Sequence, residues 1–297
     1  MEFKSLRDYT LDQLAVMWNE GFTGYFVDAT QSPEGFLRRF AAEHLSLDLS
    51  FAAVLEGKPV GFVLSGARAI GGTKTAWNGG TGIAPAYRGQ GIGKLMIAEA
   101  LRRYAAHGVG LATLEAIAAN APAIALYERM GYRTINRLKI LQQTGELPAV
   151  TFAAAGTGPF RVQLGTAPDV RGLSFYDHSA PWQTQWANLT NAESAILYDD
   201  QDRPLGYALF KLAYDEHGNP ASASLFQCRA DERREDAGAI VRHLLAAVFP
   251  PHPSLTRRTM NLPASHAEAV QALEQAGFSL LMEQVQMTQP LSPEEQA

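Results

Sequence analysis

The chain has 297 residues, 46% hydrophobic and 19% charged, which is typical of a folded protein of about two domains. With 25 Lys and Arg against 30 Asp and Glu, the net charge is −5, which argues against nucleic acid or an anionic membrane as the main partner. The single cysteine, Cys228, excludes an internal disulfide and a zinc site built on several thiolates, and we expect no metal. Neither a signal peptide nor an 18-residue apolar run occurs, so we expect a cytoplasmic protein without a transmembrane helix.

The first half of the chain alternates helical and strand-like patterns. Apolar residues at helical spacing predict a helix over 11–22, and Ser32 followed by Pro33 is typical of the start of a second helix. The segments 51–55 and 60–64 flank a turn and predict a β-hairpin. A third strand is expected over 75–83, where two adjacent glycines indicate a bulge or a close backbone approach.

A glycine-rich turn follows that strand and opens a helix that lasts to about residue 107. The pattern then predicts a strand over 111–117, a short helix from Asn120 to Gly131 and a strand over 132–141. Residues 143–158 are rich in Gly, Ala and Thr and form the expected linker, and the pattern does not decide whether 149–155 is a short strand.

The second half repeats this order of elements. We expect a hairpin (195–198 and 204–211), a strand (222–228), a helix (238–249), a strand (258–262), a helix ending at Gly277 and a last strand (278–287). When Arg233 is aligned with Arg88, the distances to Gly277 and Gly131 are 44 and 43 residues. The sequence therefore predicts an α/β protein with two domains of one fold, over 1–147 and 158–297, of which the second is divergent.

The most informative segment is Gly82-Ile-Ala-Pro-Ala-Tyr-Arg-Gly-Gln-Gly-Ile-Gly-Lys94. Glycines between a strand and a helix let the backbone approach a ligand, and the free N–H groups of a helix start attract an anion, so the segment predicts a phosphate-binding loop. The dinucleotide fingerprint does not fit, because Lys94 stands where its third glycine belongs. The nucleoside triphosphate loop does not fit either, because Leu95 stands where it needs Ser or Thr.

Arg88, Gly91 and Gly93 match the R/Q-x-x-G-x-G/A loop with which GNAT acetyltransferases bind acetyl-CoA. The segment from Asn120 to Tyr132 is similar to the N-x-x-A-x-x-L-Y-E-x-x-G-F/Y stretch of the same family. The resemblance covers residues 2–141, while the second half resembles the fold in its order of elements. It implies a mixed α/β sheet and two tandem GNAT-like domains, the first catalytic and the second degenerate.

Family roles carry over to matching positions of this chain. The resemblance implies that the backbone amides of Gln90 to Lys94 hold the pyrophosphate, that the strand edge at Ile83 pairs with the pantetheine arm, and that Asn120 touches that arm. Tyr127 would protonate the departing thiolate, and Glu115, twelve residues earlier, matches the base of the branch that acetylates protein N-termini. The implied cofactor-binding set is Ile83, Arg88, Gly89, Gln90, Gly91, Ile92, Gly93, Lys94 and Asn120. Glu115 also fits a structural carboxylate on a strand, and Trp182 and Trp186 fit a core or interface better than a pocket.

The resemblance implies transfer of an acetyl group from acetyl-CoA to a primary amine, either a small molecule or a peptide. The family layout places the acceptor near the loop between the first two helices, where Asn19, Glu20, Tyr25 and Asp28 are candidates for contact. Two alternatives stay open: a non-catalytic acyl-CoA-binding sensor or scaffold, and an acyltransferase that acts on a hydroxyl. The sequence does not indicate an oligomeric state.

Overall fold

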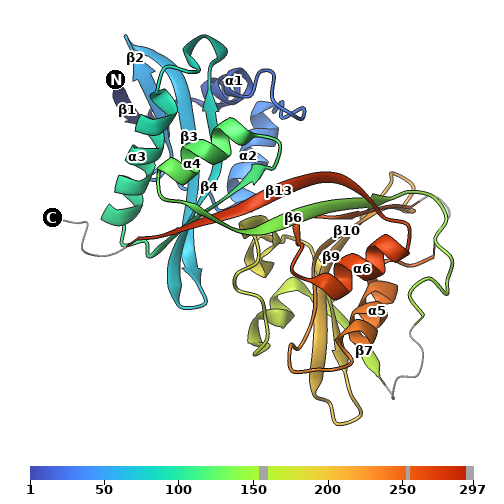
Figure 1. The fold of residues 1–297 in the computed structure, drawn as a ribbon. Helices are drawn as coiled ribbons and strands as arrows, with labels where there is room; N and C mark the ends of the chain where they lie inside the picture. Colours follow the sequence, from blue (N-terminus) through green and yellow to red (C-terminus); the bar gives the residue numbers. More distant parts are fainter. Residues whose placement is uncertain (154–159, 252–254, 292–297) are drawn as a thin grey trace. The chain divides into compact units, whose positions relative to one another are not determined.

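The computed structural model describes residues 1–153, 160–251 and 255–291, and the chain forms two compact units (Figure 1). Unit 1 contains Met1–Ile135 and the chain from Val285 on, and unit 2 contains Asn136–Gln284. These limits differ from the expected 1–147 and 158–297, because two strands, β6 (Arg133–Gln143) and β13 (Ser279–Pro290), contribute residues to both units.

Unit 1 is built on a mixed sheet whose strands lie in the order β1-β2-β3-β4-β5-β13. The strands before β13 are β1 (Glu2–Ser5), β2 (Phe51–Leu55), β3 (Lys58–Ile70), β4 (Thr73–Ile83) and β5 (Leu111–Ile117). The β2–β3 hairpin is confirmed, and its turn residues Glu56 and Gly57 both have positive φ, as a tight hairpin turn requires. Strand β1 was not predicted.

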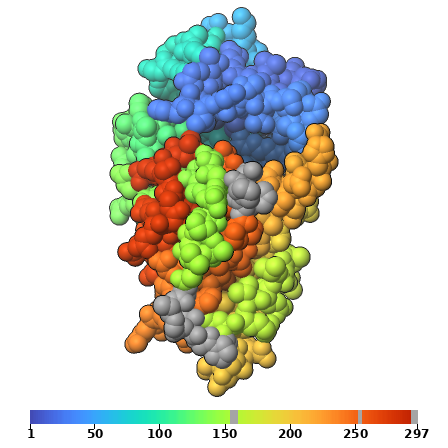
Figure 2. All heavy atoms as spheres, turned by 90° about the vertical axis from the view of Figure 1, so that its right-hand side faces the viewer, coloured from blue at the N-terminus to red at the C-terminus, as the bar shows by residue number. Residues whose placement is uncertain are grey.

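Helices cover both faces of the sheet in unit 1. On one face lie α1 (Leu11–Gly21) and α2 (Pro33–Ala42), which are blue in Figures 1 and 2, and on the other lie α3 (Ile92–Ala106) and α4 (Ala121–Arg129). Thr10 and Gln13 form a capping box at the start of α1, and Ser32 caps α2 ahead of Pro33, which confirms the predicted start of the second helix.

The end of the chain completes the core of unit 1. Val285, Met287 and Leu291 are buried in the same apolar cluster as residues of α3, α4 and β5, and Met287 is 0% exposed. The backbone N–H of Leu291 donates to the carbonyl of Gly110 at 2.9 Å. A domain that stopped at residue 147 would therefore lack one strand of its sheet and part of its core.

In the described residues, the sheet of unit 2 has the same strand order as the sheet of unit 1, but no pair of α-helices covers its second face. Its strands are β7 (Arg161–Thr166), β8 (Glu193–Tyr198), β9 (Pro204–Tyr214), β10 (Pro220–Ala230), β11 (Thr256–Thr259), β12 (Leu262–Pro263), and parts of β6 and β13. Helices α5 (Ala237–Val248) and α6 (Ala267–Gln275) cover one face. On the other face, the described chain forms short 3₁₀ turns between residues 167 and 188. Trp182 is 2% exposed there, and Trp186 packs against the core, so neither tryptophan opens a pocket.

The register of the two units confirms the predicted repeat. In unit 1, four parallel β4–β5 pairs end at Asn78 and a bulge follows at once. In unit 2, four parallel β10–β11 pairs end at Leu225, and again a bulge follows at once. The N-cap residues of α4 and α6, Asn120 and His266, have nearly equal dihedral angles (φ −86°, ψ 62° and φ −82°, ψ 66°).

The expected linker over 143–158 is partly described. Residue 143 ends β6, and 144–153 form turns and irregular backbone, so no strand runs over 149–153. Residues 154–158 lie outside the described residues. Among the helices of the described chain, none is long and apolar enough to cross a membrane.

Candidate functional site

The glycine-rich turn before α3 forms an open cradle for an anion. Gly89 and Gly91 adopt φ of 75° and 80°, and a Cβ added at either position would meet open space. Gly91 is the N-cap of α3, and no side chain caps this helix end. The first N–H groups of a helix have no partner inside it, and the helix dipole favours negative charge there. The geometry fits the predicted phosphate loop, in which Gly89, Gly91 and Gly93 contribute backbone without a side chain.

Arg88 holds the turn in place through backbone contacts. Its Nε donates to the carbonyl of Ile83 at 2.9 Å, and its Nη2 donates to the carbonyls of Gly21 at 3.0 Å and Thr23 at 2.8 Å. The side chain therefore fastens the end of β4 and the end of α1 to the loop. Lys94, by contrast, is an exposed side chain on the first turn of α3.

Strands β4 and β5 diverge beside this loop. Their parallel pairing ends at Asn78 and Leu114. The N–H of Ala84 donates to the carbonyl of Val60 at 2.9 Å. Since hydrogen-bonded pairs alternate in an antiparallel ladder, the peptide groups of Thr81 and Ile83 face away from β3, toward the opening. The N–H of Ile83 therefore faces the opening, while its carbonyl accepts from Arg88. The pairing of this edge with a pantetheine arm stays a prediction.

A bulge at Gly79 decides which side chains face this opening. Gly79 has no partner on β3, because Leu64 pairs with Gly80 and Ser65 pairs with Asn78. The extra residue puts Asn78 and Thr81 on one face of β4, where the Thr81 hydroxyl lies 2.9 and 3.1 Å from the two polar atoms of the Asn78 amide. Sequence reasoning anticipated the bulge and missed both of these polar residues.

Tyr127 reaches this polar pair from α4. Its side chain is 9% exposed, and burial raises the pKa of its hydroxyl to about 12, against the opposing effect of a hydrogen bond with Thr81. The phenol therefore keeps its proton at neutral pH. Asn120 caps α4 by accepting from the N–H of Ala123 at 3.3 Å. Burial also raises the pKa of Tyr25, against a hydrogen bond with Asn120, so Tyr25 joins this group from the α1–α2 loop.

Glu115 lies on the opposite face of the sheet. Its neighbours Leu114 and Ala116 point into the core under α3 and α4, so Glu115 points to the face covered by α1 and α2. There the indole N–H of Trp77 donates to Glu115 Oε2 at 2.6 Å. Glu115 and Tyr127 thus approach the diverging strands from two faces, and Trp77 is a partner that sequence reasoning missed.

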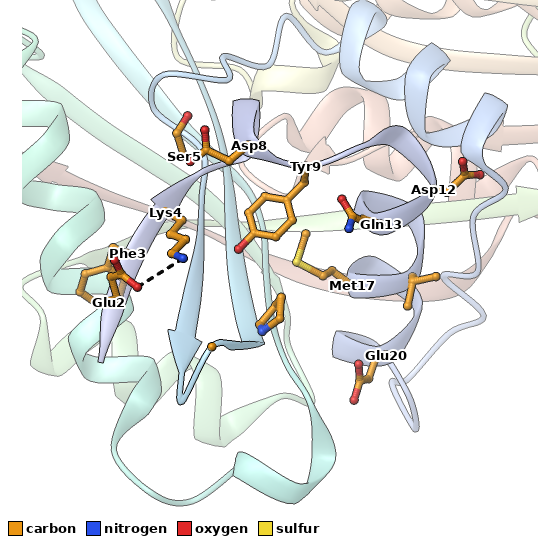
Figure 3. A pocket seen from close by; sticks show the side chains of 13 residues that line it. Glu2, Phe3, Lys4, Ser5, Asp8, Tyr9, Asp12, Gln13, Met17 and Glu20 are labelled. Atoms are coloured by element: carbon orange, nitrogen blue, oxygen red, sulfur yellow. Dashed lines mark ion pairs between the residues drawn. The ribbon is translucent and has the colours of Figure 1, made fainter.

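Two of the proposed acceptor contacts serve the α1–α2 loop itself. The Asn19 side chain exchanges hydrogen bonds with the backbone of Gln31, and Asp28 accepts from the N–H of Thr30. Glu20 instead lines a hollow of about 880 Å³ between β1 and α1, together with Tyr9, Met17 and other residues (Figure 3). That hollow contains no residue of the glycine loop or of the strand opening.

The matching place in unit 2 is built differently. Asp236 is the N-cap of α5, where unit 1 has Gly91, and its carboxylate pairs with Arg234 at 2.7 Å. Leu273 stands on α6 where Tyr127 stands on α4, and it is fully buried. Cys228 is buried as well, and burial raises the pKa of its thiol.

An internal ion cluster occupies the strand divergence of unit 2. Arg229 pairs with Tyr207 on β9 as Gly82 pairs with Phe62 on β3, so an arginine replaces a glycine. Asp177 lies 3.2 Å from Arg229 and 3.3 Å from His266. Burial by itself would raise the pKa of Asp177, but hydrogen bonds from His266 and Ser179 and the charge of Arg229 lower it to about 2. The positive charge of Arg229 is thus paired with the negative charge of Asp177 inside unit 2.

Comparisons with known proteins agree with the repeated fold. Residues 11–132 match the acetyltransferase (GNAT) family, and no curated protein matches the chain. A tandem GNAT protein from the clavulanic acid biosynthesis pathway is 16% identical with a TM-score of 0.61, over 98% of this chain and 99% of that one. A GCN5-related N-acetyltransferase from Sphaerobacter thermophilus is 13% identical with a TM-score of 0.60, over 97% and 95%. One from Anabaena variabilis is 15% identical with a TM-score of 0.58, over 97% and 72%.

At these identities the solved structures establish the fold, and the family match rests on the segment that holds the glycine loop, Glu115 and Tyr127. The family transfers acyl groups and generally uses acetyl-CoA as the donor. In the described chain, no three His, Cys, Asp or Glu side chains are grouped to hold a metal ion. Residues 11–132 therefore form a domain of the GNAT acetyltransferase family, and the whole chain has the fold of a tandem GNAT protein.

Proposed function

We propose that unit 1 transfers an acetyl group from acetyl-CoA to a primary amine by direct attack in a ternary complex. The observation that carries the proposal is the uncapped start of α3 behind Gly89 and Gly91, next to a strand opening that Tyr127 reaches with its proton in place. The acceptor is a small molecule or a peptide, and neither nucleic acid nor a membrane takes part.

Each side chain has a separate task in this proposal. The amides of Gln90 to Lys94 hold the pyrophosphate, and the edge of β4 at Thr81 and Ile83 holds the pantetheine arm, with Asn120 at its side. Acetyl-CoA supplies the activated acyl group: a C–N bond forms to the amine as the C–S bond breaks. Glu115 takes the proton of the amine, directly or through water, and Tyr127 gives its proton to the departing thiolate.

The base is the more necessary of the two groups. A lysine-like amine has a pKa near ~10.4, so about one molecule in 2,500 is the neutral nucleophile at pH 7. A positioned base typically contributes about 10²–10⁴-fold to such a step. A thiol with a pKa of about 8.5 leaves readily, so the acid contributes less.

We propose further that unit 2 is degenerate and binds no acetyl-CoA. Asp236 stands at the position of Gly91 and Arg234 at that of Gly89, and the two side chains pair at 2.7 Å. The pair offers a phosphate no net positive charge, and its side chains occupy positions where unit 1 has only backbone. Unit 2 then supports unit 1 without taking part in the chemistry.

Titration calorimetry combined with a thiol-release assay tests the proposal. We expect one acetyl-CoA per chain, and thiol release that depends on an amine from a panel of metabolites and peptides, with an acetyl mass shift on the acceptor. Binding without release from any amine would favour the acyl-CoA sensor, and release with alcohols alone would favour a hydroxyl acceptor. A second site of comparable affinity would contradict the degeneracy of unit 2.

A further inference from the structure

Arg39 on α2 contacts the one residue of β4 that the sheet leaves unpaired. Its Nη2 donates to the carbonyl of Gly79 at 2.6 Å, and Gly79 is the bulge residue. The bulge follows directly on Asn78, where the pairing between β4 and β5 ends. Arg39 is therefore hydrogen-bonded to the backbone at the point where the site opens.

The guanidinium of Arg39 is itself fixed from two sides. Its Nε lies 2.7 Å from Oε2 of Glu43, the C-cap residue of α2, and these two side chains are 19% and 14% exposed. Its Cζ lies 4.2 Å from the centre of the Trp18 ring, which is 4% exposed. Because the Glu43 carboxylate and the Trp18 ring restrict the Arg39 side chain to few rotamers, its guanidinium can hold the Gly79 carbonyl in one position.

Two tryptophans enclose the bulge. A Cβ at Gly79 would lie 2.4 Å from the Trp77 ring, and a Cβ at Gly80 would lie 2.9 Å from the Trp18 ring. The Trp77 indole in turn donates to Glu115 at 2.6 Å. Because the packing is this close, a shift of the bulge moves the Trp77 ring, and a shift of that ring moves Glu115.

We infer that Arg39 is a positioning residue, which acts through the Gly79 bulge and Trp77 to hold Glu115 in place for the transfer. The same bulge places Thr81 on the face of Tyr127, so one contact from α2 sets both sides of the opening. The kinetic part of this inference rests on the proposed function. The coupling between Arg39 and Trp77 is a property of the fold and stands apart from it.

The direct test is the indole N–H resonance of Trp77 in the full-length protein labelled with ¹⁵N, assigned with Trp77→Phe. Arg39→Gln should move this resonance, and Arg38→Gln should not. Arg38 is a matched control, because it is the neighbouring arginine of α2 and its side chain is exposed. An unmoved Trp77 resonance in folded Arg39→Gln would overturn the inference, whatever the activity of the protein.

Kinetics test the consequence for Glu115. A displacement of about 1 Å can cost about 10²-fold in rate. Arg39→Gln should therefore lower kcat about 10- to 100-fold and alter the acidic limb of the pH profile of kcat/KM. Arg39→Lys, which keeps the charge and loses the planar fork, should recover part of the rate. The thermal shift with acetyl-CoA should persist in both variants, because the glycine loop is unchanged.

The two possible failures are distinguishable. If the wild-type chain transfers no acetyl group to any amine, the proposed function fails, while the Trp77 resonance still decides the coupling. If the wild-type chain is active and Arg39→Gln keeps its kcat and pH profile, Arg39 does not position the base. A loss of rate shared equally by Arg38→Gln would also contradict a specific role for Arg39.

Discussion

Met287 links the stability of unit 1 to the far end of the chain. Its side chain is 0% exposed and belongs to the core formed by Met96, Tyr104 and Leu114, although more than 170 residues separate it from each of them. We predict that Met287→Ala destabilises unit 1 selectively, because the cavity opens in the core beneath α3 and α4.

The expected magnitude follows from the burial. Replacing a buried Met by Ala costs about 2–5 kcal/mol, and we take about 3 kcal/mol because Met is flexible and its neighbours adjust in part. In a unit of about 150 residues, each kcal/mol lowers the Tm by roughly 2–4 °C. The transition of unit 1 should therefore fall by about 6–12 °C.

Differential scanning calorimetry with and without acetyl-CoA measures this effect. Acetyl-CoA at about 100 times its Kd adds about 2.7 kcal/mol to the state that binds it, which identifies the transition of unit 1. Leu37→Ala is a matched control within unit 1, because Leu37 lies on α2 with its side chain 57% exposed. That change should stay within about 0.5 kcal/mol of the wild type.

Two results would refute the reasoning. One is a Met287→Ala protein whose acetyl-CoA-sensitive transition is unchanged. The other is a chain that ends at residue 147, unfolds cooperatively at the wild-type temperature and still shifts with acetyl-CoA. Either result would mean that the last strand does not form part of the core of unit 1.

Three further predictions concern the site and unit 2. Gly91→Asp should abolish the thermal shift with acetyl-CoA. Gly57→Asp, at another exposed glycine with positive φ, should keep the shift. An unchanged shift in Gly91→Asp would contradict the assignment of the phosphate loop. Tyr127→Phe should lower kcat more than it weakens acetyl-CoA binding. Since the pKa of Tyr127 is raised from 10 to about 12, its contribution to the free energy of unfolding should be lost as pH rises through that range. Tyr127→Phe has no group that titrates there, so its free energy of unfolding should fall less with pH in alkaline unfolding experiments. The pKa of Asp177 is lowered from 3.8 to about 2, so Asp177 contributes about 2 kcal/mol to the free energy of unfolding above pH 4 and loses this contribution as pH falls toward 2. In denaturant titrations, the free energy of unfolding of Asp177→Asn should fall less between pH 4 and pH 2 than that of the wild type.

Local features of the site could be predicted from the sequence, because residues close in the chain decide them. Gly89 and Gly91 adopt positive φ because glycine has no Cβ, and the helix that follows starts without a side-chain cap. Asn120 caps α4 with its own side chain. The adjacent glycines in β4 indicated the bulge that the structure has. The spacing of these signals also predicted that the fold occurs twice.

Only the tertiary structure decided which distant residues meet. Nothing in the sequence of β13 indicates that its second half pairs in unit 1, because a strand edge offers the same backbone groups to any partner and long-range packing selects one. The contact of Arg39 with Gly79 and that of Trp77 with Glu115 join segments about 40 residues apart, and the bulge turns Thr81 toward Tyr127. Local patterns fix elements and loops because their energies depend on neighbours in the chain, whereas the environment of a catalytic side chain depends on contacts that exist only after the sheet has formed.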